Sequence, residues 1–140
     1  MQLVATTMAL PAVTTFEECA DFSKTVAPFI PQLYELPQQL LKSWSNPQEL
    51  LELYIATNPL ISAVAFGLAL FPIVWIGSEI NRNYSQVDRL WSILPAIFIA
   101  HFAAYGHLVG LETERLDTLL VAVVIWSVSY LKDGLAQRLM

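Results

Sequence analysis

Two long stretches of the chain contain no charged residue, and they end at Ser78 and at Leu111. Each is rich in leucine, isoleucine, valine, alanine and phenylalanine. A bilayer core of about 30 Å is crossed by roughly 20 apolar helical residues. The pattern therefore predicts two membrane-spanning helices, at 59–77 and 90–111.

A third apolar stretch, TLLVAVVIWSVSYL, lies between Asp117 and Lys132. It covers only about 21 Å of helix, which is less than the bilayer core. Lys132 can extend toward lipid headgroups while Asp117 sits at the opposite interface, so we expect a third span at 116–131 and a short tail at 132–140. A helix buried against other partners is the alternative.

Residues 1–58 are too rich in charge to cross a bilayer, and we expect short amphipathic helices at the membrane interface. Thr15 and Glu18 have the spacing of a capping box, and that helix should end at Pro28 and Pro31. A later stripe of leucines keeps a helical period across Pro37: Leu33, Leu36, Leu40 and Leu41.

An asparagine followed by a proline occurs twice, at Asn46-Pro47 and Asn58-Pro59. Asparagine is a preferred helix cap, and proline is tolerated at the first helical position because its missing N–H needs no partner there. We therefore expect a helix over 47–57 that leads directly into the first span.

The composition changes the picture from a soluble domain to a membrane protein. Of 140 residues, 56% are hydrophobic and 14% are charged, whereas soluble domains carry about 25% charged residues.

The net charge of -5 argues against a nucleic-acid partner. Cys19 is the only cysteine, which excludes an intramolecular disulfide and a cysteine metal cluster. The expected partners are the lipid bilayer and either another membrane protein or a second copy.

Basic residues set the expected orientation. In a three-span arrangement, one side carries Arg82, Arg89, Lys132 and Arg138, against Lys42 and Arg115 on the other. Cytosolic loops are enriched in lysine and arginine, so the loop after the first span should face the cytosol.

The polar segment NRNYSQVDRLWSILP, residues 81–95, separates the two strongest spans. Ser85 and Asp88 have the spacing of a helix cap followed by an acid that favours the positive helix end. Asn83 and Tyr84 lie outside that explanation. They are the candidate catalytic residues, because their side chains could donate hydrogen bonds to a substrate carbonyl or to a lipid headgroup. The alternative is structural: the asparagine tolerates the turn and the tyrosine marks the membrane interface.

Two histidines lie inside the second span, where ionisable residues suggest function. His101 and His107 are about 120° apart around a helix, so one face cannot present both to a metal, and we expect no metal site. His101 and Tyr105 share a face, and they could form a hydrogen-bonded pair or transfer a proton.

The stretches NPLISAVAF, SEINRNYSQVDRLWSILP and AHFAAYGHLVGLETERLDTLL together resemble the N-terminal half of a fungal membrane-protein family of unassigned function. That family is grouped with steroid 5-alpha-reductase-like proteins. The resemblance implies a helical protein of the endoplasmic reticulum or another endomembrane, with NADPH-dependent reduction of a lipid double bond. Its signature positions here are Asn81, Asn83, Tyr84, Ser85, Asp88, Arg89, Trp91 and Pro95.

The resemblance stops after Trp126, where SVSYLKDGLAQRLM replaces the relatives' continuation. The missing part carries most of the expected cofactor contacts, so no cofactor-binding residue is expected in this chain. One hypothesis is a truncated N-terminal part of a reductase-like protein, inactive alone. The other is a non-catalytic membrane adaptor that packs against a partner membrane protein.

Overall fold

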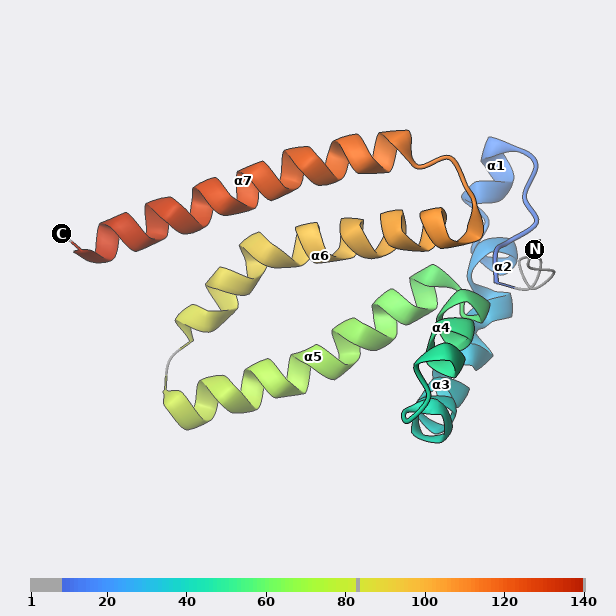
Figure 1. Cartoon of the computed structure of the whole chain (residues 1–140), viewed down its shortest axis with the longest axis horizontal. Coiled ribbons are helices and arrows are strands. Elements are labelled where there is room, and N and C mark those ends of the chain that lie inside the picture. The colour runs from blue at the N-terminus through green and yellow to red at the C-terminus, as the bar shows by residue number, and fades with distance from the viewer. Residues whose placement is uncertain (1–8, 83, 140) are drawn as a thin grey trace. The chain divides into compact units, whose positions relative to one another are not determined.

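The computed structural model consists of α-helices and one short 3-10 helix, with no strand in the residues it describes, 9–82 and 84–139 (Figure 1). Side chains are described for these residues except those of 85–89, 131 and 133–139. The predicted all-helical class is confirmed. The helices fall into two compact units, Met1–Phe66 and Gly67–Met140.

The first unit contains five short elements and the first turns of a long helix. They are α1 (Phe16–Cys19), α2 (Phe22–Thr25), η2 (Ala27–Phe29), α3 (Ile30–Ser43), α4 (Pro47–Ala56) and the start of α5 (Pro59–Asn81). Thr15 caps α1 as predicted, with its Oγ1 accepting from Glu18 N at 3.3 Å. The predicted end of that helix at Pro28 and Pro31 is wrong. Asp21 caps a new helix, α2, and the two prolines lie at the starts of η2 and α3.

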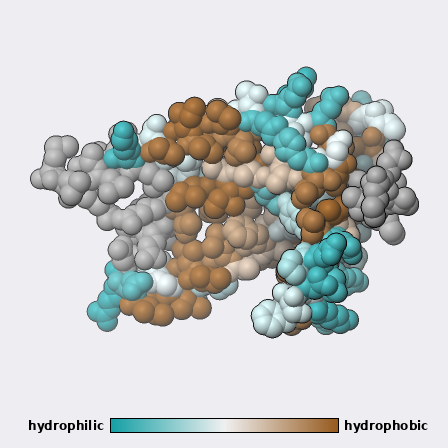
Figure 2. All heavy atoms as spheres, viewed as in Figure 1, coloured by the Kyte–Doolittle hydropathy of each residue, from teal (hydrophilic) through white to brown (hydrophobic). Residues whose placement is uncertain are grey.

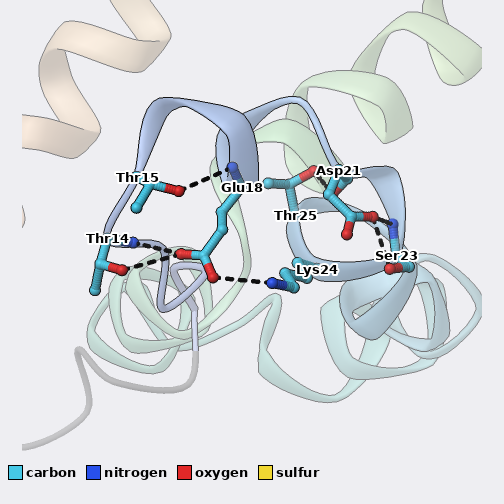
Figure 3. Close-up of polar contacts among 7 residues, drawn as sticks. All are labelled: Thr14, Thr15, Glu18, Asp21, Ser23, Lys24 and Thr25. Carbon is cyan, nitrogen blue, oxygen red and sulfur yellow. Dashed lines mark hydrogen bonds and ion pairs between the residues drawn. The ribbon is translucent and has the colours of Figure 1, made fainter.

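Polar contacts connect α1 to α2 (Figure 3). One Glu18 carboxylate oxygen accepts from Thr14 N at 2.9 Å and Thr14 Oγ1 at 3.1 Å, and the other accepts from Lys24 Nζ at 2.9 Å. The Lys24 ammonium, with the Thr14 donors, lowers the pKa of Glu18 to about 2. The carboxylate therefore bridges the chain before α1 to the helix after it.

Both predicted Asn-Pro helix starts are confirmed. Asn46 Oδ1 accepts from Gln48 N at 3.0 Å at the start of α4. The helix expected over 47–57 forms as α4, which ends at Ala56, and Thr57, with an extended backbone at ψ 137°, caps it immediately before Asn58. α5 then begins at Pro59, with Asn58 Oδ1 accepting from Leu60 N at 2.9 Å.

Asn58 makes contacts that the local sequence does not reveal. It is buried, with 4% of its surface exposed. Its backbone N donates to Gln32 Oε1 on α3 at 2.9 Å, and its Nδ2 donates to the carbonyl of Ala9 at 2.7 Å. One capping residue thus joins three segments of the first unit that are far apart in sequence.

The second unit contains the rest of α5, α6 (Ser85–Val109) and α7 (Glu114–Leu139). α6 and α7 run side by side in opposite directions (Figure 1). Gly110, with φ +76°, ends α6: Leu111 N donates to the Gly106 carbonyl at 2.9 Å, and Gly110 N to that of His107 at 3.3 Å. This is the Schellman arrangement, in which a left-handed glycine satisfies the last carbonyls of a helix.

Small residues let α6 lie close to α7 and to the turn that precedes it. A Cβ added at Gly106 would lie 2.5 Å from Thr113 Cγ2, which no real contact allows. Further along, Ser127 Oγ donates to the carbonyl of Ser92 at 2.6 Å. Close approach through small and hydroxyl side chains is typical of helix pairs in membranes.

Two of the described helices are long and apolar enough to cross a membrane, namely α5 over Pro59–Asn81 and α6 over Leu90–Val109. Of their most apolar stretches, 11% and 22% are buried inside the structure, unlike the core helix of a soluble protein. In the second unit, hydrophobic residues gather along the middle of the helices, with hydrophilic residues toward their ends (Figure 2).

The expectation of a third span over 116–131 is corrected, because two helices meet this criterion and not three. A helix does form there, but α7 carries Glu114, Arg115 and Asp117 in its first turns and Lys132 toward its far end. The apolar stretch between these charges is too short to cover a bilayer core of about 30 Å.

Candidate functional site

A pocket of about 360 Å³ lies between α5 and α6 in the second unit. Its wall is almost wholly apolar: Gly67, Leu70, Phe71, Val74, Trp75, Ser78, Tyr84, Leu90, Trp91, Leu94 and Phe98. This volume is within the range of small-molecule sites, roughly 300–1,000 Å³. The pocket is therefore the candidate site of this chain.

Helical spacing brings these side chains to one wall. On α5, Gly67, Phe71, Val74 and Ser78 follow one another at intervals of three or four positions, which places them on one face. Gly67 leaves space there, since a Cβ at that position would be 4.0 Å from the Phe98 ring on α6. The pocket is thus formed by two apolar helix faces that meet across small residues.

Ser78 is the polar exception in the α5 wall. Only 1% of its surface is exposed, and its Oγ is the one buried side-chain nitrogen or oxygen without a hydrogen-bond partner among the described side chains. A buried hydroxyl without a partner costs about 1–3 kcal/mol. Such a group in a pocket wall calls for an explanation beyond packing.

Tyr84 is the candidate catalytic residue that the structure places at this pocket. Its hydroxyl donates to Glu79 Oε1 at 3.1 Å, so the end of α5 and the start of α6 are joined across the turn. Asn83, the other candidate, lies outside the described residues. The catalytic role suggested for the pair stays a prediction.

The turn between α5 and α6 differs from its predicted form. Tyr84 occupies the cap position of α6 without a side-chain cap bond, so the prediction that Ser85 caps this helix is wrong. The backbone is already helical at Tyr84, with φ -79° and ψ -9°, so the helix begins one residue too early for Ser85 to cap it. The left-handed residue of the turn is Arg82, with φ 48°, whereas Asn81 ends α5.

The remaining signature residues lie along α6. Trp91 lines the pocket and is largely exposed, and Pro95 lies inside the helix with its side chain exposed. Ser85, Asp88 and Arg89 belong to the first turns of α6, and their side chains lie outside the described set. The structure thus brings Tyr84 and Trp91 together at one pocket.

A second polar cluster lies where α6 meets α7, and the sequence did not suggest it. Thr113 Oγ1 donates to Asp117 Oδ2 at 2.9 Å, and His107 Nε2 lies 3.1 Å from Asp117 Oδ1. The Thr113 hydroxyl lowers the pKa of Asp117, and His107 adds to this effect. The Thr113 hydroxyl oxygen also lies 3.1 Å from His107 Nε2, so the three side chains form one hydrogen-bonded cluster. It stabilises the start of α7.

The histidines do not meet each other. His107 joins the cluster just described, whereas the His101 ring packs edge-on against Phe102, with ring centroids 5.2 Å apart. The pairing of His101 with Tyr105 stays a prediction. Within the described residues, no group of three histidine, cysteine or acidic side chains could hold a metal ion.

Together, these features define an all-helical protein with two helices suited to a membrane and an apolar pocket. The chain is 32% identical over 118 residues to the uncharacterised protein C594.04c of Schizosaccharomyces pombe. The match covers 84% of this chain and 33% of the yeast protein, so the chain spans about a third of that relative's length. No protein-family profile and no solved structure matches the chain.

The comparison confirms a fungal relative of unassigned function, as the resemblance implied. It does not concern a reductase, and that part stays a prediction. Ser78 was missed in the sequence because a single serine in an apolar helix normally bonds to a carbonyl of its own helix. Its position on the Gly67–Phe71–Val74 face is the signal that could have drawn attention to it.

Proposed function

We propose that the chain is an integral membrane protein that holds an apolar, lipid-like molecule between α5 and α6. The observation that carries this proposal is the pocket, which combines a molecule-sized volume with an almost wholly apolar wall. Both walls belong to the helices that are long and apolar enough for a membrane.

Photolabelling tests this proposal. The full chain in phosphatidylcholine nanodiscs is irradiated with a decane that carries a diazirine, and the labelled peptides are identified by mass spectrometry. We expect labels on α5 and α6 pocket residues that excess decane removes. Val74→Trp should fill the pocket and abolish them, whereas Val124→Trp, at an exposed position on α7, should not. Labels that are spread evenly over all apolar helix faces in both variants would contradict the proposal.

The reductase-like activity is the finer part of the proposal, and it rests on the resemblance through residues 81–95. Its supposed cofactor does not fit the pocket, because the described lining has no basic side chain to pair with the phosphates of NADPH. Under this proposal the cofactor is held by a segment outside this chain, and the chain alone is inactive. Saturable NADPH binding by the purified chain would contradict it.

A tagged chain should co-localise with an endoplasmic-reticulum or other endomembrane marker.

An adaptor is the second candidate, and one observation favours it. α7 is too interrupted by charge to pass as a span, yet it exposes apolar side chains such as Val121, Ile125 and Val128. A membrane-protein partner or a second copy would cover that face. Crosslinking in native membranes should then give a defined adduct through α7, and recovery of the monomer alone counts against the adaptor.

A further inference from the structure

We propose that Ser78 is the polar anchor for the ligand of the α5–α6 pocket, and that this ligand is a neutral apolar molecule with one hydroxyl or carbonyl group. The assignment rests on the pocket function proposed above. It adds the chemical class of the ligand and the atom that selects it.

The hydroxyl of Ser78 differs from three other helical hydroxyls in the described chain. Three comparable groups bond to a carbonyl in the preceding turn: Ser62 to Pro59 at 3.1 Å, Thr118 to Glu114 at 2.8 Å and Ser129 to Ile125 at 2.9 Å. This internal bond is the usual way for a serine to satisfy itself in an apolar helix. Ser78 Oγ is buried and does not make one in the structure.

The hydrogen-bonding capacity of the Ser78 hydroxyl determines which ligand group could be its missing partner. The hydroxyl can donate one hydrogen bond and accept others. Because the Ser78 oxygen is itself covered in the structure, a rotation of about 120° to another staggered side-chain position would bring it to the ligand. A ligand alcohol or carbonyl that enters the pocket would then supply the missing partner.

The charge of the ligand follows from the same wall. No acidic or basic side chain lines the pocket among the described residues. An ionised carboxylate or ammonium would lose its hydration there without a counter-ion, which is strongly unfavourable. The Tyr84 hydroxyl already donates to Glu79. A long-chain alcohol, aldehyde or ketone therefore fits, whereas a fatty-acid anion does not.

The test compares decanol with decane as competitors of the photoreactive decane, on the full chain in nanodiscs, with each concentration corrected for partition into the lipid. We expect decanol to displace the probe about three- to tenfold better than decane in the natural chain. Ser78→Ala should abolish this preference and leave decane unchanged. Ser129→Ala, which removes a hydroxyl outside the pocket, should preserve the preference.

The outcomes separate the anchor from the pocket. If decane displaces the probe but decanol displaces it no better than decane in the natural chain, the anchoring role of Ser78 is wrong and the pocket function stands. If neither compound displaces a localised label from the natural chain, the pocket function fails and the anchor with it. Ser78→Cys keeps a weak donor of similar size, and it should give an intermediate preference. A full preference for decanol in Ser78→Ala would also overturn the anchor.

Discussion

Ser127 Oγ on α7 donates a 2.6 Å hydrogen bond to the backbone carbonyl of Ser92 on α6, and both residues are buried. The bond crosses the interface between the two antiparallel helices of the second unit. It also contrasts with Ser78, a serine that is equally buried and has no partner.

These two serines should therefore respond oppositely to removal of the hydroxyl. Ser127→Ala loses a buried bond and should destabilise the chain by about 1–2 kcal/mol. Ser78→Ala removes an unsatisfied group and places a better helix former, so it should be neutral or stabilising. Unfolding in mixed micelles, followed by circular dichroism, measures both. Equal losses in the two variants would show that the hydroxyl of Ser78 has a partner.

The two Asn-Pro helix starts predict a graded loss of stability. Asn46→Ala removes one exposed cap and should cost about 1 kcal/mol. Asn58→Ala removes a cap and the bond to Ala9 at a buried position, so about 2–4 kcal/mol is expected. The same unfolding assay applies, with limited proteolysis between α3 and α5 as a second readout. Indistinguishable midpoints for the two variants would exclude the tertiary role of Asn58.

The close approach of Gly106 to Thr113 can be tested by a double-mutant cycle. Gly106→Ala should destabilise by about 1–2 kcal/mol net, because overpacking outweighs the gain in helix propensity. Thr113→Ser removes the Cγ2 that lies 2.5 Å from the added Cβ and keeps the hydroxyl that donates to Asp117. The double variant should recover most of the loss. Strict additivity of the two changes would refute the contact.

Glu18 should give the chain a local dependence on pH. Its pKa falls from 4.5 to about 2 in the folded chain, with Lys24 the largest cause. A lowered pKa means that its contribution to stability is complete above pH 4.5 and is lost as the pH falls through about 2. Nuclear magnetic resonance of the carboxyl carbon follows this titration directly.

Lys24→Gln is the matched control for that titration. The midpoint of Glu18 should move back toward 4.5, yet stay below it because the Thr14 donors remain. A midpoint that does not move would show that the ion pair is not formed. High salt should shift the natural chain in the same direction, since the pair is partly exposed.

Local signals in the sequence were enough for helix class and for several helix starts. Thr15, Asn46 and Asn58 cap where their spacing predicted, because a cap depends on only a few neighbouring residues. Asp21 was missed as a cap because no spacing rule distinguished a second short helix from a continued one. Ser85 was displaced from the cap position because the backbone at Tyr84 is already helical.

Contacts between distant segments lay beyond such signals. Nothing near Asn58 in sequence indicates Ala9 or Gln32, and nothing near His107 indicates Asp117. The pocket could not be predicted either, because it forms where two apolar helix faces pack, and hydropathy alone does not show which residues of the two faces meet. Four residues of the polar segment at 81–95 line the pocket, namely Tyr84, Leu90, Trp91 and Leu94, and the structure adds Ser78 from the preceding helix.

The contacts between α6 and α7 have a mechanical meaning. Ser92 and Gly106 on α6 are separated by the same number of positions as Thr113, just before α7, and Ser127 on α7, so both pairs belong to one antiparallel register. A slide of one helical turn, about 5.4 Å, would break both pairs at once. The contacts with α7 therefore fix the position of α6 along its axis, and with it the position of the pocket residues Trp91 and Leu94, which α6 carries.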